Sequence, residues 1–112
     1  MKLPHLIFAI LCASCATSPT PEEQALAMLQ KSRQHLADER YDAARDSILS
    51  MRRLYPTAVQ ARAQGILLLD SIEMLAARDS MGSATGEEWK RLSVKAQFFE
   101  RKLQEDRKKQ QK

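Results

Sequence analysis

The sequence predicts an all-α protein built from antiparallel helical hairpins, with about four helices of which the last two are long. Residues of high helix propensity dominate the chain, chiefly Ala, Leu, Arg, Gln, Glu and Lys. Glycine occurs three times among 112 residues, and no alternation of apolar and polar residues of useful length predicts a strand. A chain of this size buries a modest core, which favours one small domain made of local helix pairs.

The first 21 residues are expected to precede the folded domain. Lys2 stands before the apolar run Leu6–Leu11 and a group of small residues, a pattern typical of a secretory signal. The run is too short to span a membrane, which takes about 20 apolar residues. We therefore divide the chain into a signal peptide over 1–14, a lipidated tether over 15–21, a helical domain over 22–107 and a frayed basic tail over 108–112.

Both cysteines of the chain lie at the end of the apolar run, at positions 12 and 15. The stretch Cys12-Ala-Ser-Cys15 resembles a bacterial lipobox, and this resemblance implies that Cys15 becomes the acylated N-terminus. An ordinary signal peptide and a redox or metal-binding pair remain as alternatives. A redox pair would need a strand-loop-helix context, and a zinc site would need two more ligands.

The first helix is expected from about Glu22 to Leu36. Thr20 or Pro21 can start it, with two glutamates in the first turn. Its buried face is expected to follow spacings of four, three and four residues. That face runs along Ala25, Leu29, Ser32 and Leu36.

The second helix is expected from about Tyr41 to Leu54, because a residue before proline avoids the α region and Pro56 follows Tyr55. We expect Ala44 to lie opposite Ser32, since two small residues let the helices approach closely. The apolar line of this helix runs along Tyr41, Ala44, Ile48, Met51 and Tyr55.

Two longer helices are expected, one over about Thr57–Ser80 and one from about Glu87 to Arg107 or beyond. The glycine-containing stretch 82–86 separates them. Ile66–Leu69 is a run of four apolar residues, so the third helix should pack on two sides, against the second and fourth. Thr85 and Glu88 could form a capping box. The apolar lines run along Val59, Ala63, Ile66, Ile72, Leu75 and Ala76 in the third helix and Trp89, Leu92, Ala96, Phe99 and Leu103 in the fourth.

One stretch, residues 39–56, resembles the second half of a tetratricopeptide repeat. The match rests on Tyr41, Ala44, Ile48, Met51 and Pro56, which fall on the offsets of that repeat. It covers about one repeat of roughly 34 residues and implies a concave face that binds peptides or helices. The order of segments along the whole chain also resembles small lipoproteins of Bacteroidota, which implies an envelope location and no particular reaction.

Charge is unevenly distributed along the chain. Residues 22–89 carry a net charge of −3, whereas residues 90–112 carry +6. The basic tail is either a solvated helix end or a surface for anionic lipid headgroups or an acidic protein. In the second case it could hold the far end of the domain while Cys15 holds the near end. The candidate interaction residues are Arg107, Lys108, Lys109 and Lys112.

Residues suited to catalysis are few. His35 is interpreted as a surface or helix-end histidine. Asp70 and Glu73 lie one turn apart and could be a general acid and base, but we expect them to form salt bridges to an arginine of the second or fourth helix. No phosphate loop, nucleophile elbow or metal spacing is present in the sequence. We therefore predict no enzymatic activity, no cofactor and no metal.

Two functional classes remain. The first is a lipid-anchored adaptor of the bacterial cell envelope, on the outer membrane facing the periplasm, which binds another envelope protein through its helical hairpins. The second is a structural or spacer lipoprotein that self-associates, or that contacts the membrane or cell wall through its basic C-terminal helix. We expect no nucleic-acid partner, since an exported protein meets little nucleic acid, and we keep a homo-oligomer as a possible assembly.

Overall fold

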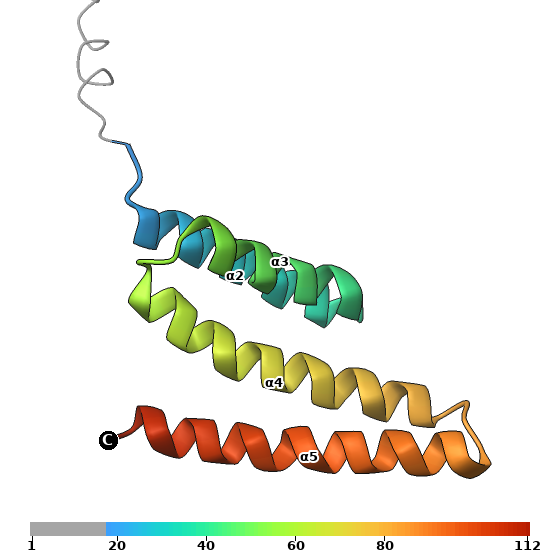
Figure 1. The fold of residues 1–112 in the computed structure, drawn as a ribbon. Coiled ribbons are helices and arrows are strands. Elements are labelled where there is room, and N and C mark those ends of the chain that lie inside the picture. Colours follow the sequence, from blue (N-terminus) through green and yellow to red (C-terminus); the bar gives the residue numbers. More distant parts are fainter. Residues whose placement is uncertain (1–17) are drawn as a thin grey trace, which may run out of the picture.

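The structure is a computed structural model that describes residues 18–112. It contains the four helices α2 (Pro21–Ala37), α3 (Tyr41–Leu54), α4 (Val59–Met81) and α5 (Gly86–Gln110), shown in Figure 1. No strand occurs in this part of the chain, which confirms the all-α class and the two long final helices. The predicted signal peptide and the lipidation site at Cys15 lie outside the described residues.

The helices stack as two hairpins (Figure 1). α2 and α3 form the first hairpin, and α4 packs against both of them. α5 lies along the other side of α4 and contacts no other helix of the described chain. α4 is therefore covered on two sides, as its apolar run predicted, and it contacts α2 in addition to the two expected neighbours.

The contact between α2 and α3 contains fully buried residues of both helices. The predicted face of α2 is buried at Ala25, Leu29 and Ser32. Ser32 lies opposite Ala44 as expected, and its hydroxyl donates a hydrogen bond to the Ala44 carbonyl oxygen at 2.7 Å. Ile48 and Met51, further along the predicted line of α3, are also fully buried.

Gly65 lets α4 approach this hairpin closely. A Cβ atom at this position would lie 2.9 Å from the Met51 Cε and 3.6 Å from the Ile48 Cγ2. Even an alanine would therefore force the flexible end of the Met51 side chain to move aside. Between α4 and α5 the buried hydrophobic cluster consists of Leu92 and the small residues Ala77 and Ala96.

α2 and α4 run parallel, and residues 20–23 at the start of α2 cap both helices. Thr20 and Glu23 form a complete capping box at the start of α2. The Glu22 carboxylate accepts hydrogen bonds from the backbone N–H groups of Gln60, at 3.3 Å, and Ala61, at 2.7 Å. Glu22, a residue of α2, therefore caps α4. α4 begins at Val59, two residues later than the expected Thr57.

The predicted capping box of α5 is wrong. Thr85 does occupy the N-cap position, but its side chain makes no capping hydrogen bond. The Glu88 carboxylate instead accepts hydrogen bonds from the Arg91 guanidinium, one turn further along the helix.

Two residues expected on apolar lines lie at the surface. Val59 is 73% exposed, because α5 ends opposite Ala63 and so does not reach the first turn of α4. Trp89 is 45% exposed, because α5 contacts only α4 and no second helix covers its first turn.

The C-terminal helix continues beyond Arg107, which its expected range allowed, and into the segment expected to fray. α5 runs to Gln110, so residues 108–110 are helical rather than frayed. The Gln110 side-chain amide donates a hydrogen bond to the Ala63 carbonyl oxygen at 2.7 Å. This contact holds the end of α5 against the beginning of α4.

Candidate functional site

Asp70 is the one charged side chain in the core of the described chain. It lies on the side of α4 that faces α5, and its side chain is 3% exposed. The Lys102 ammonium donates hydrogen bonds to Asp70, at 3.1 Å, and to Asp106, at 2.7 Å. The second carboxylate oxygen of Asp70 is buried and has no hydrogen-bond partner. The three side chains tie the middle of α4 to the last turns of α5.

Burial raises the pKa of Asp70 to about 6. The neighbouring Asp106 carboxylate acts in the same direction, and Lys102 opposes both. The pKa of Lys102 is raised, chiefly through its hydrogen bond to Asp106. Lys102 therefore stays cationic, which does not suit a nucleophilic amine.

A pKa near 6 suits general acid–base chemistry, but the geometry of Asp70 does not. The side chain is closed off by Lys102 and Asp106, so a substrate would have to open the α4–α5 contact to reach it. We interpret the cluster as a structural tie between the two helices.

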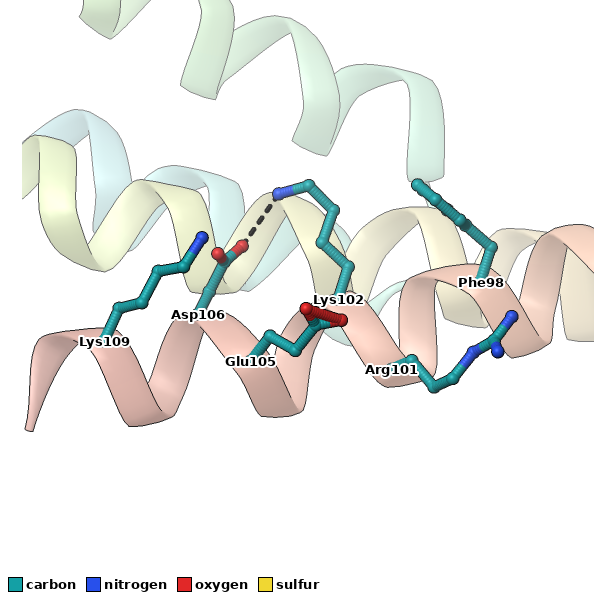
Figure 2. Close-up of a pocket in the computed structure, with 6 residues that line it drawn as sticks. All are labelled: Phe98, Arg101, Lys102, Glu105, Asp106 and Lys109. Atoms are coloured by element: carbon teal, nitrogen blue, oxygen red, sulfur yellow. Dashed lines mark hydrogen bonds and ion pairs between the residues drawn. The ribbon is translucent and has the colours of Figure 1, made fainter.

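Figure 2 shows the hollow beside this cluster, on the surface of α5. It measures about 440 Å³, and all of its lining residues come from that single helix. Its walls mix three cations with two acids and the half-exposed ring of Phe98. Phe98 packs edge to face on Phe99, with ring centroids 5.0 Å apart. The hollow contains no Ser, Cys or His that could act as a nucleophile or metal ligand.

A second hollow is lined by apolar and basic residues and by no acidic residue. It is a groove of about 220 Å³ over α4, between α2 and α5, two helices that do not touch each other. Three leucines form its apolar part, and arginines from α2 and α5 add positive charge without any carboxylate. We call it the α2–α5 groove, and its lining residues are Arg33, Gln64, Leu67, Leu68, Ser71, Leu103 and Arg107.

Local packing positions the polar groups of this groove. The Arg33 guanidinium donates a hydrogen bond to the Gln64 side-chain oxygen at 3.1 Å, which fixes it above the floor. Ser71 donates to the Leu67 carbonyl oxygen one turn back on α4, so its hydroxyl turns toward its own helix. Arg107 lies on the opposite wall and makes no ion pair within residues 18–112.

The four candidate interaction residues of the tail do not share one surface hollow in the structure. Arg107 lines the α2–α5 groove, whereas Lys109 lines the hollow of Figure 2. Lys108 and Lys112 are exposed. The groove itself was missed in the sequence, because its walls come from helices far apart in the chain and its leucines match the spacing of an ordinary core.

The residues considered for catalysis, His35, Asp70 and Glu73, lie at a helix end or in salt bridges. His35 is half-buried in the last turn of α2. Glu73 forms the predicted salt bridge with an arginine of the second helix, Arg45, whose Nε donates to it at 3.0 Å. The predicted partner of Asp70 was an arginine and is wrong: the partner is Lys102. A lysine reaches this site because its long aliphatic stem can lie along α5 while the ammonium bridges two carboxylates.

Comparisons with known proteins add no identity. No family model, no curated protein and no solved structure matches the chain. Within residues 18–112, no helix is both long and apolar enough to cross a membrane. The same residues contain no group of three or more His, Cys, Asp or Glu side chains placed to hold a metal ion. The resemblances to a tetratricopeptide repeat and to Bacteroidota lipoproteins stay predictions.

Proposed function

We propose that this chain is a lipid-anchored adaptor of the bacterial cell envelope, attached through Cys15 and facing the periplasm from the outer membrane. It binds a segment of another envelope protein in the α2–α5 groove and catalyses no reaction. The signal-like N-terminus with its lipobox-like cysteines supports the location. The groove, an apolar floor between two arginines from different helices, is the observation that carries the binding role.

The chemistry of the groove defines the partner segment. Leu67, Leu68 and Leu103 offer an apolar floor, which favours aliphatic or aromatic side chains. Arg33 and Arg107 stand on the two walls, and no lining residue is acidic. A carboxylate of the partner could accept hydrogen bonds from either guanidinium in a charge-assisted pair. We therefore expect a short segment in which apolar residues alternate with Asp or Glu.

Photo-crosslinking in cells tests this proposal. A benzoylphenylalanine placed at Ser71, in the groove, should form a discrete adduct with a second protein. The matched position is Gln97, an exposed residue of α5 outside the groove. The Ser71 adduct should disappear when Arg33 and Arg107 are both replaced by glutamate, because the groove then repels a carboxylate.

Three outcomes contradict the proposed function. The first is that positions 71 and 97 give the same adducts. The second is that the adduct from position 71 persists when both arginines are replaced. The third is no adduct from the groove at all, since an adaptor must hold its partner there.

Self-association is the second candidate function, and two exposed apolar side chains favour it. Val94 and Phe98 lie one turn apart on α5 and are 66% and 51% exposed. An isologous contact along α5 would bury both of them. Sedimentation equilibrium of the lipid-free domain should then show a dimer that Phe98→Ser weakens at least tenfold, and a monomer at all concentrations would contradict this candidate.

A further inference from the structure

The described residues carry opposite charge at the two ends of the molecule. One end comprises residues 18–23, 52–62 and 105–112, which contain seven Lys or Arg and four Asp or Glu, a net charge of +3. The other end comprises residues 37–46 and 73–91, which contain five Lys or Arg and eight Asp or Glu, a net charge of −3. We call these the basic end and the acidic end. Figure 1 shows the C-terminus at the basic end and both hairpin turns at the acidic end.

Specific contacts bring the three basic segments together. Glu22 binds the backbone of Ala61, so the beginnings of α2 and α4 meet. Gln110 binds the carbonyl oxygen of Ala63, so the end of α5 meets the same turns of α4. α3 runs back along α2 and places its last residues beside them (Figure 1).

The cations of the basic end are not neutralised by the protein itself. None of the seven forms an ion pair within residues 18–112, whereas four of the five at the acidic end do. The acids of the basic end are mostly occupied: Glu22 and Glu23 cap helices, and Asp106 pairs with Lys102. The seven cations are Arg52, Arg53, Arg62, Arg107, Lys108, Lys109 and Lys112.

Apolar side chains accompany this charge. Leu54 and Val59 flank the connection between α3 and α4 at the basic end, and they are 54% and 73% exposed. Exposed aliphatic groups among cations are typical of surfaces that lie at a lipid interface.

The chain upstream of Ser18 also joins the molecule at the basic end. Residue 18 leads into α2 two residues before its N-cap, at the same end of the molecule as the C-terminus, with the beginning of α4 between the two (Figure 1). The basic tail therefore lies at the same end of the domain as residue 18; it was expected at the far end from Cys15, which itself lies outside the described residues. The reason is the antiparallel course of α5, which returns along α4 to the point where the domain begins.

We propose that the basic end is a docking surface for an anionic lipid bilayer, with its lysines on the phosphate headgroups and Leu54 and Val59 in the interface. The charge complementarity and the exposed apolar pair carry this proposal, and neither depends on a lipid at Cys15. An acyl chain at Cys15 would add a second attachment at the same end, the combination that holds a protein stably at a membrane. The acidic end would then point away from the bilayer.

The first test measures vesicle binding by the lipid-free chain from Ala16 onward. This segment includes every described helix, and all of the buried residues and hydrogen bonds above have their partners within it. The probes are vesicles of phosphatidylglycerol with phosphatidylcholine, and vesicles of phosphatidylcholine alone. We expect sedimentation with the anionic vesicles that 0.5 M salt abolishes, because the Debye length then falls to a few Å.

Two triple variants with the same net charge test whether binding depends on the basic end or only on the total charge of the protein. The first replaces Lys108, Lys109 and Lys112 by glutamine. The second replaces Lys90, Arg91 and Lys95, exposed cations in the first half of the same helix, also by glutamine. Each cation near an anionic surface contributes about a fivefold change in partitioning. The first variant should lose at least tenfold in affinity, and the second less than threefold. Equal losses in both, or no binding by the unmodified domain, would overturn the proposal.

The fluorescence of the single tryptophan of the chain can report how the domain is oriented on the bilayer. Trp89 lies 18 residues before Arg107 on α5, about 27 Å away along the helix axis. Brominated acyl chains in the vesicles should leave its fluorescence unchanged. In a Trp89→Phe, Leu54→Trp variant the new tryptophan should be quenched. Quenching of Trp89 and not of the tryptophan at position 54 would reverse the orientation and overturn the proposal.

Discussion

The Ser32 hydroxyl and the Ala44 carbonyl oxygen lie 2.7 Å apart in a hydrogen bond that crosses the buried contact of α2 and α3. Both residues are completely buried, so the hydroxyl has no alternative partner in solvent. The bond sets the register of the first hairpin, and the small size of both side chains allows the helices to approach closely. The same hairpin forms one wall of the α2–α5 groove and supplies the cap of α4.

Enlarging one member of this pair should destabilise the domain. Ala44→Leu would overpack the α2–α3 contact and lower the free energy of unfolding by about 1–3 kcal/mol, measured by urea denaturation of the chain from Ala16 onward. Ala27→Leu is the matched control, because Ala27 is exposed on α2. Equal unfolding free energies for the Ala44 variant and the unmodified domain would contradict the packing described here.

Removing the Glu22 carboxylate should weaken the start of α4. Glu22→Ala leaves the N–H groups of Gln60 and Ala61 without their acceptor, and the loss of a helix cap costs about 1 kcal/mol. Hydrogen exchange should accelerate at these two amides, while Gln24→Ala, a change at an exposed neighbour, should leave them protected. Unaltered exchange in the Glu22 variant would show that the cap contributes nothing.

Asp70 should make stability depend on pH. The unfolded chain releases the Asp70 proton near pH 3.8, but the folded protein keeps it up to about pH 6. Stability from this group is therefore present in full below pH 3.8 and is lost as the pH rises to about 6. The carboxyls with lowered pKa values, Glu23, Glu88 and Asp106, lose their contributions only as the pH falls below about 4.5.

The window between pH 4.5 and 6.5 consequently isolates Asp70. We expect the unfolding free energy of the unmodified domain to fall by about 2 kcal/mol across it, relative to that of Asp70→Asn, which has no proton to lose. Parallel pH profiles of the two proteins would show that Asp70 is ionised throughout this range.

The sequence was sufficient for the parts of the fold that depend on local pattern. α3 begins and ends at the predicted residues, because Tyr55-Pro56 is a strong stop and a polar turn precedes Tyr41. The small pair Ser32 and Ala44 was also predictable, since a regular apolar line on each of two adjacent helices leaves one way to pair them.

Contacts between distant residues were not predictable in the same way. The run Ile66–Leu69 covers several faces of α4, so periodicity alone did not show that Gly65 faces Met51 or that the buried position toward α5 is Asp70. The groove walls at Arg33 and Arg107 are 74 positions apart in the sequence. The gathering of charge at the basic end depends on the direction of α5, which only the packing of the second hairpin determines.

The modification state of Cys15 tests the central claim of this account most directly. The full chain should be recovered from the membrane fraction of a bacterial host with its mature N-terminus at Cys15, carrying acyl groups detected by mass spectrometry. Cys15→Ser should leave the protein unprocessed or release it from membranes, whereas Cys12→Ser should have no effect. An unmodified N-terminus at another residue, or loss of membrane attachment in the Cys12 variant alone, would contradict a lipid-anchored adaptor.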